Sequence, residues 1–380
     1  MRIAVAVSGG VDSLCALLLL RRAGHELLAL HALLTESSGA PPAGLDAACR
    51  DLGVPLEVVD LRARFARDVI APFAAAYAAG RTPNPCARCN RSLKFGALLD
   101  AALARGAEAL ATGHYARLAP HTRRGAPGPL LAMAAHAPKD QSYFLSLVPR
   151  ERLARALFPL AAMDKTACSA LVAQAGLAVP LPEESHDICF APGGVDAYRN
   201  FLERQWQVLG MEPPGPGPVL LCETALPGDH GSRKPQDAAG PSPGNDAAPH
   251  LRPIATHAGL WRYTEGQRRG LGLSHAEALH VLRKDVAANA LVVGPRSLLG
   301  MRGCVAREVN VAVPPAFWPE RPVVRCRYGG GLSPAEARLE DGELRIRFAE
   351  PCFPSAPGQV VTLYDEDGVV LAAGIVEELA

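Results

Sequence analysis

Over residues 1–200 the chain alternates short apolar runs with longer stretches in which apolar residues recur at helical spacing. The runs predicted to be strands are 3–7, 26–33, 55–60 and 108–112, and the stretches predicted to be helices are 14–23, 45–52 and 93–105. Strands separated by helices are typical of βαβ units, in which helices cover both faces of a parallel sheet. This region is therefore predicted to be an α/β domain.

The pattern changes after residue 200. Residues 211–258 are rich in Pro and Gly, and their polar, low-complexity part, 228–249, offers nothing for a core. We therefore expect a mobile loop insertion within a small central domain, 201–279. From residue 280 onward, short alternating apolar runs are separated by turns such as Asp341-Gly342 and Asp367-Gly368. Residues 280–380 are predicted to form an antiparallel β-barrel.

Composition and charge limit the possible classes of protein but do not identify a function. A chain of 380 residues is long enough for two or three domains, and a net charge of +1 means that any surface for nucleic acid must be local. The sequence shows neither a secretory signal nor an apolar run long enough to span a bilayer. Ten cysteines in such a chain favour reduced thiols, metal ligands or catalytic groups over a disulfide scaffold. We expect a cytoplasmic protein with no membrane partner.

The segment Ser8-Gly9-Gly10-Val11-Asp12-Ser13 lies between the first predicted strand and the first predicted helix. Adjacent glycines let the backbone turn tightly around an anion, and a helix N-terminus favours negative charge. Asp12 is suited either to cap the helix or to hold Mg²⁺ against phosphates. The segment lacks the spacing and the Gly-Lys ending of a Walker A loop. An ordinary βα turn is the alternative, but the whole hexapeptide favours phosphate binding.

Three cysteines are candidates for chemistry. Cys86 and Cys89 form a Cys-x-x-Cys in a Pro-rich loop, and Cys189 follows about a hundred residues later. Spacing alone leaves catalysis, a metal site and inert burial open. The basic side chains expected to lower the pKa of Cys89 are Arg88, Arg91 and Lys94.

The hexapeptide resembles the pyrophosphatase-loop signature of the ATP pyrophosphatases, and the chain as a whole resembles the tRNA-specific 2-thiouridylase family. The motifs that carry the second resemblance run along nearly the whole length. They are residues 8–13, Gly80 to Pro85, Cys89-Asn90, Lys94-Phe95, Ala111 to Tyr115, Lys139 to Phe144, Ile188-Cys189-Phe190 and Gly266 to Gly272. The Lys-Asp-Gln-Ser-Tyr-Phe run and the pair Cys89 and Cys189 are specific to this family.

The resemblance implies a fold of the adenine-nucleotide alpha-hydrolase type and an ATP-dependent tRNA sulfurtransferase. ATP with Mg²⁺ would adenylate the C2 oxygen of the wobble uridine, and AMP and pyrophosphate would be released. Cys189 would carry the incoming sulfur as a persulfide, and Cys89 would be the partner nucleophile. A Cys89–Cys189 disulfide would remain to be reduced. The partners implied are tRNA and a sulfur-donor protein, either a cysteine desulfurase or a relay carrier.

The resemblance also assigns binding residues one by one. Those matched to ATP are Ala6, Val7, Ser8, Gly9, Gly10, Val11, Asp12, Ser13, Ala32 and Gly113. Those matched to tRNA are Asn84, Pro85, Cys86, His114, Lys139, Asp140, Gln141 and, in the C-terminal barrel, Arg327, Tyr328 and Gln359. By residue type alone His114 is a solvated loop residue and Lys139-Asp140 a helix start.

Two features depart from the family pattern. Many members have an aspartate where this chain has Cys86, and a thiol is a poor substitute for a carboxylate in proton exchange. The change also creates a set of three thiols, Cys86, Cys89 and Cys189, which related thiolases use to hold a four-iron four-sulfur cluster. Such a cluster is an alternative to the persulfide. The second departure is the long Pro/Gly-rich insertion, for which the sequence suggests no role.

Two other classes of protein share the ATP-binding turn. An amide-forming ligase would need a glutaminase partner or an amino-acid site, and it would have no use for Cys89 and Cys189. A non-enzymatic RNA-binding module that senses nucleotide would bind ATP without producing AMP. Only the sulfurtransferase produces 2-thiouridine.

Overall fold

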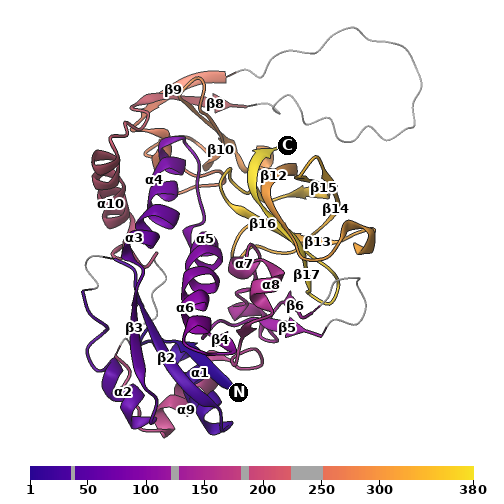
Figure 1. Ribbon diagram of the computed structural model, residues 1–380. Helices are drawn as coiled ribbons and strands as arrows, with labels where there is room; N and C mark the ends of the chain where they lie inside the picture. Colours follow the sequence, from indigo (N-terminus) through magenta and orange to yellow (C-terminus); the bar gives the residue numbers. More distant parts are fainter. Residues whose placement is uncertain (36–38, 121–127, 181–187, 224–250) are drawn as a thin grey trace.

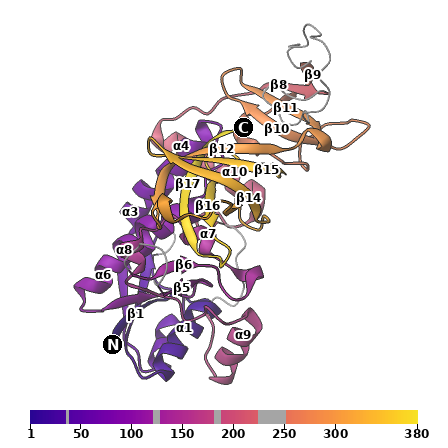
Figure 2. The ribbon, with the colours of Figure 1, turned by 90° about the vertical axis from the view of Figure 1, so that its right-hand side faces the viewer.

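The computed structural model describes residues 1–35, 39–120, 128–180, 188–223 and 251–380. The chain is arranged as an α/β domain, a small four-stranded sheet and a closed barrel (Figure 1). The small sheet projects beyond the other two parts when the molecule is turned (Figure 2). The fold class expected from the sequence is confirmed.

The α/β domain is built on a five-stranded parallel sheet of order β3-β2-β1-β4-β7. Its strands are β1 (Arg2–Ala6), β2 (Glu26–Leu33), β3 (Leu56–Asp60), β4 (Ala109–Ala111) and β7 (Ala156–Leu157). The first four lie where the sequence predicted them. Chain order reverses between β1 and β4, and ligands of open α/β sheets bind at such a point.

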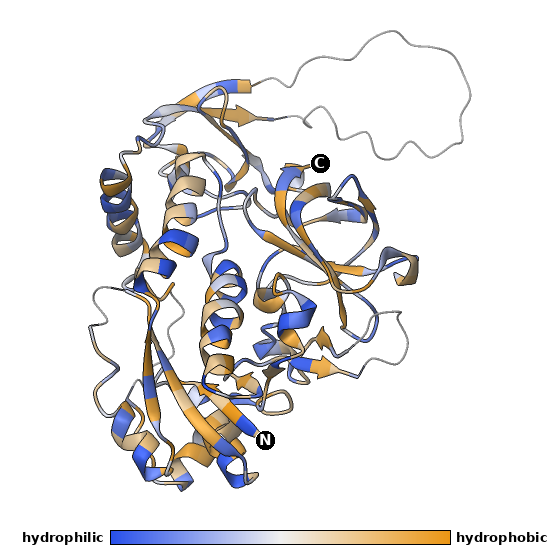
Figure 3. Cartoon of the chain, in the orientation of Figure 1, coloured by the Kyte–Doolittle hydropathy of each residue, from blue (hydrophilic) through white to orange (hydrophobic). Residues whose placement is uncertain are grey.

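Alternate residues of β1 pack against opposite layers of helices, because side chains of a strand point to its two faces in turn. Ile3 and Val5 pack with helices α1, α2 and α9, whereas Ala4 packs with α3, η1, η2 and α6. These helices are α1 (Val11–Arg22), α2 (Leu45–Asp51), α3 (Arg62–Phe65), η1 (Ala66–Ile70), α6 (Leu99–Ala104), α9 (Lys165–Gln174) and the π-helix η2 (Asn90–Leu98). Apolar residues are concentrated in the strands between these layers (Figure 3).

The helix predicted over 93–105 is one part of a longer, broken run. It begins with α5 (Pro85–Cys89), continues as η2, and changes direction at Gly96, whose φ and ψ of −96° and −106° are not helical. The break leaves carbonyl groups without helical partners. Arg152 donates hydrogen bonds of 2.7 Å to the carbonyl oxygens of both Phe95 and Gly96. Sequence periodicity could not predict these hydrogen bonds from a residue so distant in the chain.

The small sheet has the order β10-β11-β8-β9. Its strands are β8 (Gly217–Cys222), β9 (Leu251–His257), β10 (Leu279–Asp285) and β11 (Ala290–Pro295). Two of these strands lie inside the segment expected to be a loop insertion, so that expectation is wrong for 217–222 and 251–257. Their apolar residues, among them Val219 and Leu221, supply the core of the sheet. The stretch 228–249 lies outside the described residues.

The closed barrel has the strand order β12-β15-β14-β13-β16-β17. Its strands are β12 (Met301–Val311), β13 (Val323–Arg325), β14 (Ser333–Glu340), β15 (Glu343–Cys352), β16 (Val360–Tyr364) and β17 (Val370–Leu379). The sequence placed the start of the barrel at residue 280, but β10 pairs with β11, and β11 pairs with β8 of the small sheet. Strand-like periodicity does not reveal which sheet a strand joins.

The remaining elements connect these three parts. They are α4 (Ala71–Ala78), β5 (Arg117–Ala119), β6 (Leu130–Ala132), η3 (Ala137–Lys139), α7 (Ser142–Leu145), α8 (Arg150–Leu153), α10 (Gly194–Leu209), η4 (Leu260–Arg262), η5 (Arg296–Leu298) and η6 (Pro315–Phe317). Helix α10 lies beside α4 (Figure 1), and Trp206 donates a 2.8 Å hydrogen bond to the carbonyl oxygen of Ala74. No helix in the described part of the chain is long and apolar enough to cross a membrane.

A buried polar seam joins the α/β domain to the barrel. Asp140, whose side chain is 0% exposed, forms a 2.7 Å ion pair with Arg325 of β13. Beside it Ser142 and Tyr364 share a hydrogen bond of 3.0 Å, and the Tyr143 hydroxyl donates to the carbonyl oxygen of Val360. Buried polar groups that pair across an interface fix the relative position of its two sides.

The substitution Arg325→Met tests this seam. It leaves the buried Asp140 carboxylate without its cation, and breaking a buried pair in this way costs about 3–5 kcal/mol of unfolding free energy. Urea unfolding followed by circular dichroism measures the loss. Arg338→Met is the control, because Arg338 lies 4.0 Å from Glu340 in a pair whose side chains are 75% and 51% exposed. Equal effects of the two substitutions would contradict a structural role for the seam.

Candidate active site

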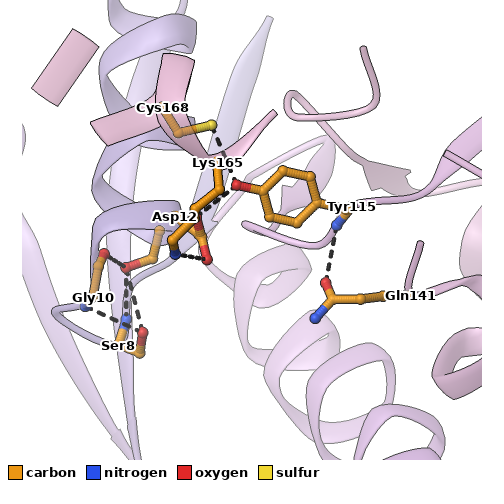
Figure 4. A network of polar contacts seen from close by, with 8 residues as sticks. Ser8, Gly10, Asp12, Tyr115, Gln141, Lys165 and Cys168 are labelled. Carbon is orange, nitrogen blue, oxygen red and sulfur yellow. Dashed lines mark hydrogen bonds and ion pairs between the residues drawn. The ribbon is translucent and has the colours of Figure 1, made fainter. Parts of the chain in front are cut away.

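The hexapeptide predicted to bind phosphate forms the turn between β1 and α1. Gly10 is the N-cap of α1 and no side chain caps the helix, so the N–H groups of its first turn point toward the space in front of it. Gly9 has a φ of +91°, which a residue with a side chain rarely adopts. Ser13 holds the turn together by donating to the carbonyl oxygen of Gly10 and accepting from the N–H of Ser8 (Figure 4). This geometry suits an anion.

Asp12 points away from the helix cap and into a polar network. Its two carboxylate oxygens accept hydrogen bonds of 2.7 Å from the hydroxyl of Tyr115 and from the ammonium group of Lys165 (Figure 4). The capping role considered from the sequence is therefore wrong. The carboxylate is still 27% exposed beside the turn. Lys165, which α9 contributes, was missed because it lies outside every motif of the turn.

Tyr115 connects this network to a loop matched to tRNA. Its hydroxyl also lies 3.4 Å from the sulfur of Cys168, and its backbone is paired with Gln141. The Gln141 side chain accepts from the N–H of Tyr115 at 3.0 Å, and the Gln141 N–H donates to the carbonyl oxygen of Tyr115 at 2.8 Å. In this structure Gln141 holds Tyr115 beside the turn between β1 and α1, and its contact with tRNA stays a prediction.

Gly113 follows β4 and lies against the turn. A Cβ atom at this position would be 2.7 Å from the carbonyl carbon of Asp12 and 2.9 Å from the nitrogen of Ser13. Only glycine therefore allows this approach of the two backbones. The ends of β1 and β2 complete the region: the ring of His31 hydrogen-bonds the carbonyl oxygen of Val7, and Ala32 follows it, half-buried. The residues matched to ATP thus lie together at the switch point of the sheet.

Helix α5 positions the first two candidate cysteines. The side chain of Asn84 caps the helix by accepting from the N–H of Ala87 at 3.1 Å, and Pro85 occupies its first turn. Cys86 is exposed on this helix, whereas Cys89 is buried at its end. The Asn84 side-chain oxygen is thereby used to cap the helix. Its predicted contact with the target base stays a prediction and would involve its other polar groups.

Cys189 approaches the same region from a distant part of the chain. It is exposed in a turn, so the inert burial considered from the sequence is wrong. The neighbouring Phe190 anchors the turn, since its ring packs edge-on against Phe65 and Phe73 at centroid distances of 5.6 and 5.1 Å. Cys89 belongs to the same apolar cluster as Phe190. The aromatic anchor explains how a residue so far along the chain is held beside α5.

One cation, Lys94, acts on all three thiols. Desolvation by the surrounding protein raises the pKa of all three thiols, and that of the buried Cys89 to about 12. Cys86 and Cys189 keep accessible surface, yet the protein around them still removes part of the solvation of their thiolates. The charge of Lys94 lowers all three pKa values in part. At neutral pH the three cysteines are therefore thiols rather than thiolates.

The two arginines expected to act on Cys89 have a different role. Arg88 and Arg91 pair with Glu308 of the barrel at 3.0 and 3.5 Å. The expectation that they lower the pKa of Cys89 is wrong, because Glu308 on β12 offers them a nearer carboxylate. Sequence distance could not reveal this pairing across domains.

His114 lies between Lys94 and Thr112, next to Gly113. It is buried, with its Nδ1 atom 2.8 Å from the Thr112 hydroxyl and its Nε2 atom 3.4 Å from the Lys94 ammonium group. Because an ammonium group can only donate, Nε2 accepts and Nδ1 carries the proton. Burial, together with Lys94, holds the pKa of His114 well below its usual value, so the ring is neutral. A solvated loop histidine is not what the structure shows.

The residues matched to tRNA in the barrel line one cleft. Arg327, Tyr328 and Gln359 share a cleft of about 280 Å³ with Thr264 and Glu265 of the central part. The guanidinium of Arg327 lies 3.9 Å from the centroid of the Phe353 ring, and the ring of Tyr328 packs at 4.5 Å on that of Phe144. The side chains of Arg327 and Tyr328 are thus held in fixed positions at the cleft.

The loop 139–141 contributes less side-chain surface than expected. The carboxylate of Asp140 is fully buried in the seam with Arg325 and also accepts from the N–H of Ala134. What this loop can offer tRNA is its backbone and Lys139, which is half-buried at the end of η3. The helix start expected at Lys139-Asp140 lies at Ser142 instead.

Within the described ranges no group of three His, Cys, Asp or Glu side chains comes together in a way that could hold a metal ion. Cys86, Cys89 and Cys189 are close enough to influence one another's pKa values, but they do not form a ligand set. The residues present therefore do not fit a four-iron four-sulfur cluster in this arrangement.

The parallel sheet, its anion-binding turn at the switch point and the attached barrel define a nucleotide-binding enzyme of the HUP-domain class. The family model described as tRNA methyl transferase HUP domain matches residues 1–193. The model described as tRNA methyl transferase PRC-barrel domain matches 241–295, and that described as aminomethyltransferase beta-barrel domain matches 301–376. These matches divide the chain where the structure does, at the start of the barrel.

Full-length relatives narrow the class. The chain is 44% identical to the tRNA-specific 2-thiouridylase MnmA of Nitratidesulfovibrio vulgaris strain Miyazaki F, with 99% of each chain covered. It is 46% identical to the enzyme of the same name from Oleidesulfovibrio alaskensis and 40% identical to that from Lawsonia intracellularis, again with 99% of each chain covered. The chain belongs to the tRNA-specific 2-thiouridylase family.

A solved structure, the U34-tRNA thiolase NcsA from Methanococcus maripaludis with its 4Fe-4S cluster, is a distant likeness. It is 15% identical, covers 55% of this chain and 67% of its own, and has a TM-score of 0.33. A likeness this slight does not bear on the cysteines.

The reactivity of Cys89 tests the electrostatics of the site. Because its pKa is raised to about 12, the thiolate fraction should rise about tenfold for each pH unit from 7 to 10 without a plateau. Alkylation by iodoacetamide, followed by mass spectrometry of the Cys89 peptide, measures this rate. Lys94→Gln should slow it further by removing the cation.

Arg88→Gln is the matched control, since Arg88 is paired with Glu308. It should leave the alkylation rate of Cys89 within about twofold, the size of effect expected from a distant, screened charge. A plateau near pH 7 would contradict the raised pKa of Cys89, and equal slowing by the two variants would show that Lys94 is not the cation that governs it.

Proposed function

We propose that this enzyme is an ATP-dependent tRNA sulfurtransferase that converts the C2 carbonyl of the wobble uridine to a thiocarbonyl. The observation that carries the proposal is the pair Gly113-His114 at the end of β4. Gly113 contacts the turn suited to phosphate, and His114 contacts Lys94, which acts on all three thiols. A carbonyl-activating half and a sulfur-transferring half are thereby parts of one site.

In the first step the C2 oxygen of the uridine attacks the α-phosphorus of ATP, and pyrophosphate leaves. The N–H groups of the α1 N-terminus and the hydroxyls of Ser8 and Ser13 would hold the phosphates. Asp12, oriented by Tyr115 and Lys165, would hold Mg²⁺, which supplies charge neutralisation at the phosphates. This step turns the oxygen into a leaving group.

In the second step the terminal sulfur of a persulfide on Cys189 attacks C2, and AMP leaves with the former C2 oxygen. The Cys89 thiolate then attacks the Cys189 sulfur, the bond from that atom to the transferred sulfur breaks, and 2-thiouridine leaves with the electron pair. The Cys89–Cys189 disulfide is finally reduced by an external dithiol. Lys94 favours these steps because its charge stabilises the thiolate.

The exposure of Cys189 supports a role as the acceptor of sulfur, since a donor protein must reach it. A cysteine desulfurase or a relay carrier is the proposed donor. The tRNA is proposed to lie across the cleft of Arg327 and Tyr328. The cysteines of the described residues are thiols rather than disulfides, which suits the reducing cytoplasm proposed as the site of action.

Substitution of single cysteines tests the sulfur relay. Incubation with ATP, Mg²⁺, a persulfide donor and unmodified tRNA should yield 2-thiouridine on mass spectrometry of the digested tRNA. Cys189→Ser and Cys89→Ser should each lower the yield by at least about a thousandfold, as expected for loss of a nucleophile. Cys49→Ala is the control, because Cys49 is buried in another core cluster.

The same assay separates this proposal from its competitors. An amide-forming ligase would keep its ATP turnover in Cys89→Ser, and a nucleotide-sensing module would form no AMP at all. Iron and acid-labile sulfide in anaerobically purified, active protein would replace the persulfide with a cluster held by Cys86, Cys89 and Cys189. Activity without iron would retain the persulfide.

Gly113→Ala tests the nucleotide half separately. The added methyl group would lie 2.7 Å from the backbone of Asp12, and forcing such a contact costs about 1–3 kcal/mol, so the affinity for ATP with Mg²⁺ should fall by about fivefold to 150-fold. Isothermal titration calorimetry measures this. Gly215→Ala, where a Cβ meets nothing within 4 Å, should bind ATP normally. Unchanged affinity in Gly113→Ala would place the nucleotide elsewhere.

A further inference from the structure

Thr82 lies where all three parts of the molecule meet. It belongs to the α/β domain, it is 9% exposed, and its N–H donates a 2.8 Å hydrogen bond to the carbonyl oxygen of Pro357 in the barrel. Its hydroxyl accepts at 3.1 Å from the ammonium group of Lys284, on β10 of the small sheet. A residue tied to both other parts at once is placed by both of them.

Three residues that line the proposed tRNA cleft are connected to Thr82, two of them directly and one through Lys284. The side chain of Gln359 donates to the carbonyl oxygen of Thr82 at 2.9 Å, and the hydroxyl of Thr264 lies 3.2 Å from that of Thr82. Glu265 reaches it indirectly, because its carboxylate lies 3.5 Å from Lys284. The wall of the cleft and the surroundings of Thr82 are therefore made by the same side chains.

The Glu265 carboxylate is buried and is paired with Lys284 at long range. Its side chain is 3% exposed, and its Oε2 atom has no hydrogen-bond partner among the described residues, although Lys284 is within 3.5 Å. Lys284 instead donates to Thr82 and to the carbonyl oxygen of Tyr263. A buried carboxylate whose neighbouring cation also binds Thr82 makes this arrangement sensitive to a charged group that enters the cleft.

A stiff segment leads from Thr82 to the cysteines. Pro83 and Pro85 fix their own φ angles and restrict the residues before them, and Asn84 between them caps α5. Gly358 of the barrel packs against this start, with room for no side chain, since a Cβ there would be 3.1 Å from the carbonyl group of Thr82. A shift at Thr82 is therefore passed to α5 instead of being absorbed.

We infer that Thr82 is a positioning residue through which tRNA in the cleft of Gln359 and Glu265 sets the placement of Cys86 and Cys89. The inference rests on the proposed function and adds to it a route by which the bound substrate organises the sulfur-transferring half. It also gives Gln359 a second role, because the amide that lines the cleft holds the backbone of Thr82.

Thr82→Val removes the hydroxyl and keeps the volume and the backbone hydrogen bond. Misplacement of catalytic groups lowers the rate more than binding, so kcat for 2-thiouridine formation should fall about tenfold to a hundredfold. The KM for tRNA should stay within about threefold. Thr82→Ser restores the hydroxyl and should restore kcat. A raised KM with kcat unchanged, or wild-type kinetics in Thr82→Val, would overturn the inference.

Alkylation of Cys89 gives a readout that a merely structural residue would not move. In the wild type, tRNA should change the alkylation rate at least about threefold, and in Thr82→Val it should change little, as expected when a coupling between two sites is removed. Gln359→Leu should reproduce this loss if Thr82→Val does not fold. An equal response to tRNA in wild type and variants would contradict the route.

The two proposals fail in different ways. Wild-type enzyme that makes no 2-thiouridine would refute the proposed function, whatever Thr82 does. Active wild-type enzyme with normal kcat and a normal alkylation response in Thr82→Val would refute only the role of Thr82.

Discussion

The site depends on the close approach of two backbones at the carboxyl end of β4. Because Gly113 has no side chain, β4 can lie directly against Asp12 and Ser13, and the turn keeps the shape suited to phosphate. The next residue, His114, is held by Thr112 and accepts from Lys94. Two neighbouring residues thus join the turn between β1 and α1 to the cation that acts on the cysteines.

The electrostatics of the cysteines follow from a competition between burial and one charge. Desolvation by the surrounding protein makes the thiols weaker acids, and Lys94 offsets this only in part. A resting site of protonated thiols limits oxidation before the substrate arrives, because the thiolate is the reactive form. The barrel takes part in this balance, since Glu308 withdraws Arg88 and Arg91 from the thiols.

Local pattern was sufficient for the α/β domain and for the turn, because alternation and glycine placement are encoded over a few residues. It failed where distant partners decide. Arg152 binds the carbonyl groups freed by the break at Gly96. Lys165 orients Asp12, and Arg325 of the barrel pairs with the buried Asp140. The small sheet was missed for the same reason, since β10 and β11 have the pattern of barrel strands.

The most direct test of the account follows the C2 oxygen of the wobble uridine. If that uridine carries a heavy oxygen isotope at C2 in otherwise unmodified tRNA, one turnover with ATP and sulfur donor should place the label in the phosphate of AMP. Mass spectrometry of AMP and pyrophosphate detects it. Label found in pyrophosphate or in water, with 2-thiouridine formed, would contradict activation of the carbonyl by adenylation at the turn between β1 and α1.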